Sequence, residues 1–467
     1  MQLPIIQPAP IVSEHSAAFQ GLFKNSCQFQ HFQNYLTGLI VLDNKTMANI
    51  TRCILDSADK TNLSRFFSEA DWDGTSVNSE RVAYGLQKTQ KQRLSAQKSV
   101  LPLDDTLFEH VGSLFEYIDK HYNHGNSTYP LAHNLVTSHY VSGAVRFPVG
   151  WRLYRRYEEF TEWERFVERH FPEATIPKRK KERNQFKKQV EPTLLADPEF
   201  LALHAAFHTK ISLAVELVKD AIEQGLLFES VLFDSWYLAP ELLEILAEHN
   251  KKWISILKIN RNISSNNLHI FNAEGQPLQF EAPKVKVEDL IPLIPAAAFK
   301  PVVVGDQTYY CFTKNVHIST LGKVRLVISF DNPDLKGTCA VLVTNHLSWN
   351  AKKIIETYLL RWPIETFYQD AKQQLGLNQY RMRKATAIEK HWCLVFVAYS
   401  FLHLDCLPAS RQKKDKPVKT IGQIVRQQTQ QLIEKLLLHT HELLDQGIDV
   451  SQVFAQLFAK QAYTMST

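Results

Sequence analysis

The stretch from residue 207 to residue 259 constrains the fold more than any other, because helical and strand patterns alternate in it. The four predicted elements are a helix from Phe207 to Gly225, a strand at Ser230–Phe233, a helix opened by Pro240, and a strand at Trp253–Ile259. Strands joined through helices usually lie parallel in one sheet. We therefore expect an α/β core in which the strand that ends just before Asp234 is central and parallel to a neighbour.

Further strands are expected on either side of this stretch. Short apolar runs at Val100–Leu103, Leu135–Val141 and Gly143–Tyr154 predict three consecutive strands, the last two joined by a tight turn at Ser142-Gly143. Between about 260 and 345 the helical pattern disappears, and short β-branched runs broken by Gly and Asp-Asn predict antiparallel strands. The sequence thus predicts a mixed sheet with a β-rich block inserted into the α/β core.

Both ends of the chain have helical patterns. Amphipathic runs at 28–41, 45–57, 60–69 and 77–93 predict a small N-terminal bundle, and a helix at 420–446 follows the basic link Arg411–Lys416. The runs 45–57 and 60–69 carry cations on polar positions and fit either a DNA-reading helix-turn-helix or simple helix packing. The cations are Lys45, Arg52, Lys60 and Arg65.

Composition narrows the class of protein without fixing its function. The 53 Lys and Arg residues exceed the 48 Asp and Glu residues only slightly, so an acidic partner is permitted but not required. Six scattered cysteines with no C-x2-C pair argue against a zinc ribbon and against a disulfide framework. No apolar window is long enough to span a bilayer. We expect an intracellular, cytoplasmic protein with reduced thiols.

One polar segment, at 155–195, concentrates positive charge. It contains Lys178, Arg179, Lys180 and Lys181, followed by a further basic pair. Such a run fits a solvated loop as well as a surface that lies against a phosphate backbone. Both interpretations stay open from the sequence.

A row of polar residues, Tyr358, Arg361, Glu365 and Lys372, follows the β-rich block. On an ideal helix these four side chains project within roughly a 60° arc, beside a separate apolar stripe. Spaced charges of this kind are common on solvated helices. Pro363 lies inside the row and is expected to kink or restart the helix, because proline cannot donate a backbone hydrogen bond.

Three carboxylates give this row a possible chemistry. Asp104 follows one predicted strand, Asp234 follows another, and Glu365 lies on the later helix, so all three can converge at one edge of the sheet. Carboxylates gathered in this way repel one another, and hard divalent cations hold them ionised. Two such cations support in-line displacement at a phosphodiester. Asp105 adjoins Asp104, and since side chains alternate along a strand, only one of the two can face the cations.

These residues resemble the DDE-class insertion-sequence transposases, which have an RNase H-like core and a YREK signature. The resemblance rests on Leu103-Asp-Asp-Thr106, on Val-Leu-Phe-Asp-Ser-Trp-Tyr around Asp234, and on the Y-x2-R-x3-E-x6-K spacing with its Arg-Trp-x-Ile-Glu flank. It extends from about residue 95 to 385. The fold it implies is α/β: an RNase H-like mixed sheet flanked by helices, with an inserted β-rich domain and an all-α N-terminal domain.

The resemblance also implies roles for particular residues. Asp104, Asp234 and Glu365 would bind Mg²⁺, with Mn²⁺ as a substitute, and catalyse cleavage. Tyr358, Arg361 and Lys372 would hold DNA phosphates. An aromatic such as Trp253, Trp349 or Tyr310 would either stack on a flipped base or belong to the core. The partners implied are double-stranded DNA, at terminal inverted repeats and at the target, and a second copy of the chain. A DNA-bound molecule would then be associated with the nucleoid.

The resemblance further implies a division of the chain. The parts are a helical DNA-binding domain at 1–95, the catalytic core at 96–260 and 346–385, the inserted β-rich domain at 261–345, and a C-terminal helical region at 386–467 for dimerisation or DNA contact.

The reaction that the resemblance implies is cut-and-paste transposition, in which the ends of the element are cleaved and then joined to target DNA by strand transfer. Two alternatives to it remain at this stage. One keeps the fold but removes recombination, leaving a metal-dependent nuclease or a domesticated protein that only binds DNA. The other is a glycosidase with Asp234 and Glu365 as an acid/base pair, which predicts metal-independent activity and gives no role to Arg361 or Lys372.

Overall fold

The computed structural model describes residues 3–57, 59–123, 125–266, 268–272, 274–408 and 418–462. The basic link Arg411–Lys416 noted in the sequence lies outside these residues. Within them, no single helix is long and apolar enough to cross a membrane, although the bent pair Pro198–Ala206 and Lys210–Glu223 passes the same test of length and composition.

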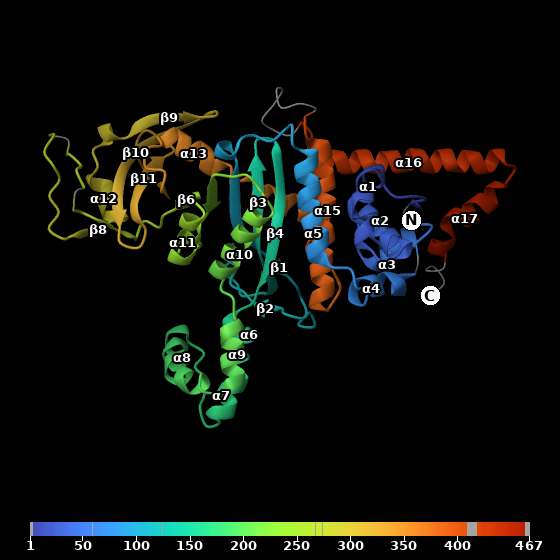
Figure 1. The fold of residues 1–467 in the computed structure, drawn as a ribbon, viewed down its shortest axis with the longest axis horizontal. Helices are drawn as coiled ribbons and strands as arrows, with labels where there is room; N and C mark the ends of the chain where they lie inside the picture. Colours follow the sequence, from blue (N-terminus) through green and yellow to red (C-terminus); the bar gives the residue numbers. More distant parts are fainter. Residues whose placement is uncertain are drawn as a thin grey trace.

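A mixed sheet forms the centre of the molecule (Figure 1). Its first five long strands lie in the order β4-β3-β1-β5-β6, with β4, β3 and β1 antiparallel and with β1, β5 and β6 parallel. The strands are β1 (Val100–Glu109), β3 (Leu131–Ser142), β4 (Val145–Tyr154), β5 (Ser230–Phe233) and β6 (Lys252–Ile256), with the short β2 (Asp119–Lys120) paired to β3. This is the RNase H-like mixed sheet expected from the sequence.

The inserted strands continue the central sheet. β12 pairs antiparallel with β6, and the antiparallel strands β11, β10 and β9 follow, so that the described residues form one ten-stranded sheet. Their bounds are β9 (Lys300–Val304), β10 (Gln307–Ile318), β11 (Gly322–Phe330) and β12 (Ala340–Thr344). A separate hairpin, β7 (Asn262–Ser264) with β8 (Lys284–Lys286), and the helix α12 (Val287–Leu290) complete the insertion.

Helices cover both faces of the sheet. On one face, α10 (Lys210–Glu223) and α11 (Pro240–Glu248) pack in a core with alternate residues of the strands, such as Leu103 and Phe233. On the other face lie α13 (Ala351–Leu359), α14 (Pro363–Gln374) and α15 (Ala385–Cys406). The 22-residue α15 is buried along most of its length, as expected of a helix that is apolar on all sides.

The N-terminal helices pack around α15 (Figure 1). They are α1 (Pro10–His15), α2 (Ser26–Val41), α3 (Met47–Cys53), α4 (Lys60–Ser68) and α5 (Gly74–Lys88). Two C-terminal helices extend from this region, α16 (Ile421–Asp445) and α17 (Val450–Ala462). Lys45, just before α3, is buried, and its ammonium group donates to the Leu42 carbonyl. Burial lowers its pKa to about 8. Lys45 therefore does not project from the pair α3–α4 as a DNA-reading side chain.

A buried arginine fastens α5 to the sheet. The guanidinium of Arg81 donates to the carbonyls of Pro148 and Val149, beside a bulge in β4, and to the side chains of Asn78 and Ser400. Arg81 is 1% exposed, and no described carboxylate forms an ion pair with it. Its bonds satisfy backbone carbonyls at the free edge of β4 that would otherwise lack partners.

The segment that the sequence left open as a solvated loop is helical instead. Between β4 and α10 the chain forms four helices that project from the sheet (Figure 1): α6 (Tyr157–Phe160), α7 (Trp163–His170), α8 (Lys180–Leu194) and α9 (Pro198–Ala206). They have a hydrophobic core of their own, which includes Trp163, Phe166 and Phe200. The aromatic residues scattered through this polar segment supply that core.

Candidate active site

The strand register brings two of the three predicted carboxylates to the same level. Pro102 in β1 is paired with Leu232 in β5, and these neighbouring strands run parallel. Continuing the register by two residues sets Asp104 beside Asp234, which directly follows the last residue of β5. Asp104 itself lies within β1, which continues to Glu109, so it does not end a strand as the sequence suggested.

Successive side chains along a strand point to opposite faces of the sheet, so their positions in the strand show which face each one lies on. Leu101, Leu103 and Phe233 belong to the core under α10 and α11, whereas Val100 and Leu232 belong to the core under α13. Asp104 and Asp234 have the parity of this second group and so face α13 and α14. Both aspartates thus share the face that carries the Tyr358–Lys372 row.

The row itself is divided between two helices. α13 ends at Leu359 and α14 begins with Pro363 in its first turn, so the predicted break at this proline is present. Tyr358 lies in the last turn of α13, where its hydroxyl donates to the Phe233 carbonyl at 3.5 Å. Arg361 lies in the break, and Glu365 lies in the first turn of α14.

Arg361 joins the first and third carboxylates. Its guanidinium forms an ion pair with Asp104 and donates to a Glu365 carboxylate oxygen at 3.3 Å. The side chain of Asp104 is 15% exposed, and that of Glu365 is 40% exposed. The two acids therefore meet around a single cationic group, at the level of Asp234.

Burial sets the protonation balance of this cluster. It raises the pKa of Asp104 to about 7, although Arg361 opposes the shift, and the neighbouring acids Glu365 and Asp105 raise it further. Burial disfavours the charged guanidinium of Arg361, but Asp104, Tyr358 and Glu365 outweigh it and the pKa of Arg361 is raised. A carboxyl group with a pKa this high is fully ionised at neutral pH only when a nearby cation favours its charged form.

Asp105 takes part in a different set of contacts. Its carboxylate pairs with the Lys210 ammonium at 2.7 Å and accepts a hydrogen bond from the Tyr237 hydroxyl at 3.0 Å. Lys210 is the first residue of α10, on the opposite face of the sheet from α14. Of the two adjacent aspartates, Asp104 is the one that meets Glu365.

The remaining predicted site residues divide into a near group and a far group. Lys372 lies close by, but its ammonium donates to the Thr106 hydroxyl at 2.8 Å and to the Leu107 carbonyl at 3.2 Å, and burial lowers its pKa. Lys178, Arg179, Lys180 and Lys181 are exposed, at and just before the start of α8, and none of them pairs with the three carboxylates.

The donor set around Arg361 consists of carboxylate oxygens, which suit a hard cation such as Mg²⁺. Among the described residues, no group of three His, Cys, Asp or Glu side chains is arranged to hold a metal ion. The positive charge between Asp104 and Glu365 is supplied by Arg361.

Two exposed tryptophans beside the site were not singled out from the sequence. Trp236 is 55% exposed and its backbone N–H donates to Asp234 at 2.8 Å, and Trp362, 65% exposed, follows Arg361 directly. The aromatics that the sequence did suggest are less available: Trp253 is buried, and Trp349 stacks on His346 with ring centroids 3.5 Å apart. Trp236 and Trp362 lie close to Asp234 and Arg361 in the sequence, and this proximity could have identified them.

Comparison with known proteins supplies the family. A family model described as DDE superfamily endonuclease matches residues 18–273, and one described as transposase DDE domain matches residues 164–401. Each match spans more than half of the chain. The chain belongs to the DDE transposases. No curated protein matches it.

The two matches divide the carboxylates between them. The first spans Asp104 and Asp234, and the second spans Asp234 and Glu365. Membership of this family implies DNA as a partner and a nuclease-type reaction, and DDE transposases generally depend on divalent metal ions. It gives the glycosidase alternative no support.

Proposed function

We propose that this DDE transposase cleaves DNA at the ends of its own element and joins those ends to target DNA. Asp104, Asp234 and Glu365 are the catalytic carboxylates of this proposal. The observation that carries it is the meeting of Asp104 and Glu365 around one guanidinium, level with Asp234 in the adjoining parallel strand. A family model for transposase DDE domains supports the same assignment of the chain to DNA chemistry.

The proposed cofactor is Mg²⁺, with Mn²⁺ able to replace it. The carboxylates of Asp104, Asp234 and Glu365 would hold the metal ions, since oxygen-only donor sets favour these cations. When bound, such ions make a water or a sugar hydroxyl more nucleophilic and stabilise the leaving oxygen of the phosphodiester. The raised pKa of Asp104 supports a site that needs added positive charge to keep its acids ionised.

Arg361 has two roles in this proposal. In the free protein its guanidinium neutralises Asp104 and Glu365, as their ion pairs indicate. With metal ions held by these acids, the guanidinium would be free to bind a DNA phosphate in the bidentate manner that arginine favours. The break between α13 and α14 supports such a movement, because Arg361 lies outside both helices.

Other residues are proposed to hold the DNA. Tyr358 adjoins the acids and offers a hydroxyl donor, while Lys372 fixes the second half of β1 and adds positive charge to this face. Lys178, Arg179, Lys180 and Lys181 are proposed as phosphate contacts outside the site, as are parts of the N-terminal helical domain at 1–95.

The proposal includes a homodimer and the division of the chain expected from the sequence. Two element ends have to be cut and joined together, so two copies of the chain are proposed to act in one complex. The C-terminal helical region at 386–467 is proposed for dimerisation or DNA contact. Its helices α16 and α17 carry exposed apolar residues, among them Leu437, Leu438 and Phe454, that suit such a role.

The test is a reaction with DNA that carries the element end. Inverted repeats in the DNA that flanks the gene supply the substrate, and the purified protein is incubated with a labelled duplex of this sequence, Mg²⁺ or Mn²⁺, and a target plasmid. Joined products are expected, and none should form in EDTA. Cleavage without joining would support a nuclease, and binding without cleavage would support a domesticated protein; either result would overturn the transposition proposal.

A further inference from the structure

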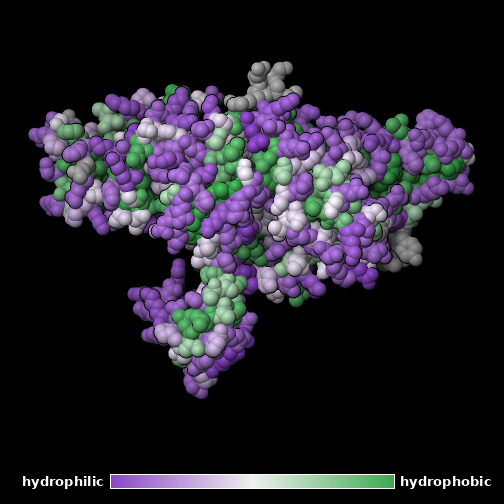
Figure 2. Space-filling view, viewed as in Figure 1, coloured by the Kyte–Doolittle hydropathy of each residue, from purple (hydrophilic) through white to green (hydrophobic). Residues whose placement is uncertain are grey.

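The four projecting helices form a distinct structural unit, here called the arm (residues 157–206, α6–α9). Figure 2 shows the arm standing away from the body of the molecule, with hydrophilic residues around its edges and hydrophobic residues in the middle of the face shown. Its own hydrophobic core holds it together without help from the sheet. The buried members of that core are Trp163, Phe166, Val167, Val190, Leu194 and Phe200.

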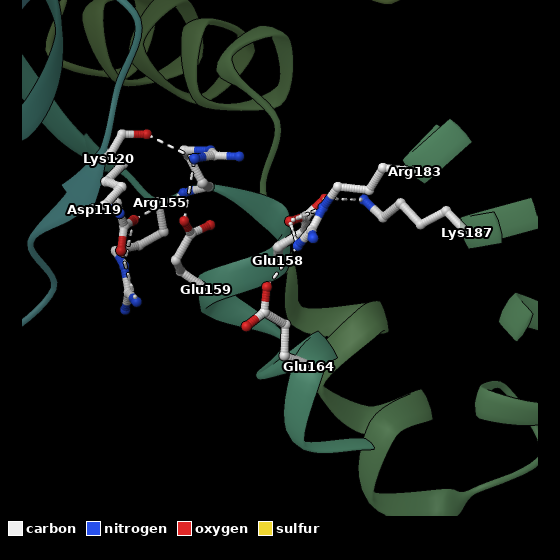
Figure 3. A network of polar contacts seen from close by, with 9 residues as sticks. Asp119, Lys120, Arg155, Glu158, Glu159, Glu164, Arg183 and Lys187 are labelled. Carbon is white, nitrogen blue, oxygen red and sulfur yellow. Dashed lines mark hydrogen bonds and ion pairs between the residues drawn. The ribbon is translucent and has the colours of Figure 1, made fainter. Parts of the chain in front are cut away.

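Ion pairs fix the base of the arm to the sheet (Figure 3). Arg155, just after β4, pairs with the buried Asp119 of β2 at 2.9 Å, and the guanidinium of Arg156 donates to the Lys120 carbonyl at 2.8 Å. A buried ion pair offsets its desolvation cost only when its hydrogen bonds are well satisfied, and the Asp119 carboxylate accepts three. These contacts therefore fix the orientation of the arm relative to the sheet.

A second group of ion pairs orients α8 within the arm. Glu158 of α6 accepts from Arg183 at 2.6 Å and pairs with Lys187 at 3.4 Å, and Arg183 also reaches Glu164 at 2.6 Å (Figure 3). The ammonium of Lys187 lies over the rings of Tyr157 and Trp163. These contacts turn one side of α8 inward and leave the other side to solvent.

None of the ion pairs formed by the arm's acids includes the exposed lysines of its basic segment. Segment 177–188 holds seven Lys or Arg residues and one acid, Glu182. Elsewhere on the arm, Asp197 and Glu199 pair with Arg165, Arg169 and His170. Four exposed lysines form no ion pair with any described residue. This lysine patch consists of Lys178, Lys180, Lys181 and Lys188.

The position of the patch is unfavourable for the arm itself. Lys180 and Lys181 occupy the first turn of α8, where the helix dipole already carries partial positive charge and favours acids. Cations there weaken the helix by some tenths of a kcal/mol each. A patch that lowers the stability of its own helix is better explained by a partner that carries negative charge.

The arm is connected to the sheet at the end toward which the carboxylates lie. β4 and β1 both run antiparallel to β3, so the end of β4, where the arm begins, lies with the second half of β1. The chain returns from the arm at Lys210, whose ammonium pairs with Asp105, the neighbour of Asp104. Lys210 lies on the face opposite α14, but the arm begins and ends at this end of the sheet, so a duplex bound at the carboxylates can extend toward it.

We propose that the arm is a fixed DNA-holding element whose lysine patch contacts the phosphates of the duplex beside the cleavage site. This inference rests on the proposed function for the position of the DNA. It deepens the phosphate contacts proposed above by assigning them to one structural element with its own core and ion pairs, and it adds Lys188 to them. Lysine binds phosphate as a point charge and reads no sequence, so the contact holds the duplex without selecting it.

The experiment compares two double charge reversals in the full-length protein. K180E/K181E alters the patch, and K98E/K219E alters two exposed lysines outside the proposed contact regions, one just before β1 and one in α10. Both change the net charge equally. Binding of a labelled element-end duplex is measured by fluorescence anisotropy in EDTA between 50 and 200 mM salt, so that the result does not depend on cleavage.

The expected result is specific to the patch. Loss of two phosphate contacts lowers the salt slope by about 1.8, so over this range the wild-type affinity should fall about 12-fold more than that of K180E/K181E. K98E/K219E should behave as wild type. Duplexes shortened stepwise from each end should abolish the difference once the contacted segment is removed.

Several outcomes would overturn the proposal. The first three are an equal loss of DNA affinity in both variants, an unchanged DNA affinity in K180E/K181E, and a difference in affinity that persists on every duplex length. The fourth is loss of a dimer by K180E/K181E with unchanged DNA affinity, which would identify the patch as a protein interface. If K180E/K181E fails to fold by circular dichroism, K180Q/K181Q supplies the same test without charge reversal. Wild-type binding without cleavage would count against the proposed function alone, because the arm is judged by binding.

Discussion

Replacing Arg361 by glutamine should tighten the binding of divalent metal ions to the free protein. The guanidinium occupies the space between Asp104 and Glu365, so in the wild type a metal ion competes with it for both carboxylates. Arg361→Gln removes that competitor and leaves the acids in place. The same change should weaken DNA binding, because the proposed phosphate contact is lost.

The size of the effect follows from the two ion pairs. Two unit charges about 4 Å apart interact by about 4 kcal/mol at an effective dielectric constant of 20. The Glu365 pair is 40% exposed on the acid side, so solvent screens most of its contribution. Counting only the buried Asp104 pair and halving it for residual screening leaves about 2 kcal/mol, which corresponds to an affinity about 30-fold higher.

The assay is a Mn²⁺ titration followed by electron paramagnetic resonance, without DNA. Removal of Arg361 raises the pKa of Asp104 further above about 7, so the titration is run at pH 8.5, where protons compete least with the metal. Arg361→Lys keeps a positive charge and should stay within about threefold of wild type. A folded Arg361→Gln protein that binds Mn²⁺ no more tightly than wild type would refute this reasoning.

Two further predictions concern stability. Arg81→Met leaves buried acceptors beside the β4 bulge unpaired and should lower the free energy of unfolding by about 2–5 kcal/mol, measured by urea denaturation; an unchanged midpoint would contradict this. Burial lowers the pKa of His391 to about 4 and of His403 to about 3, so below the unfolded pKa of about 6.5 the unfolded chain takes up protons first. Stability present above pH 6.5 should therefore fall by several kcal/mol on acidification to pH 4, and a constant urea midpoint over that range would contradict it.

Local patterns in the sequence predicted the elements of the core well. The strand Ser230–Phe233 and the helix opened by Pro240 are present as expected, and Gly225 has the positive φ of 74° that suits its place just after α10. The break at Pro363 was likewise readable, because proline has a fixed backbone and no N–H. Such features depend on neighbours in the sequence.

Features that depend on contacts between distant residues could not be predicted from local sequence patterns. The strands β9–β12 continue the central sheet because β12 pairs with β6, and no local pattern states which edge an inserted strand joins. The arm was left open as a loop because its core comes from aromatics spread over some forty residues between Trp163 and Leu203. Strand β1 runs past Asp104 to Glu109 because β3 pairs with its whole length, despite two acids in its middle.

In the candidate site too, the sequence predicted which residues are grouped but not which partners they contact. Spacing alone grouped Tyr358, Arg361, Glu365 and Lys372 in one row, whereas in the structure these residues have different partners. Arg361 pairs with two acids, Tyr358 bonds a β5 carbonyl, and Lys372 bonds the second half of β1. Those partners lie more than a hundred residues away in the sequence, apart from Glu365.

The central claim is tested most directly by strand transfer with the three carboxylates altered one at a time. Asp104→Asn, Asp234→Asn and Glu365→Gln should each reduce joined products from an element-end duplex in Mg²⁺ below detection, while the Kd for that duplex stays within about threefold of wild type. Full strand transfer by Glu365→Gln would contradict the account.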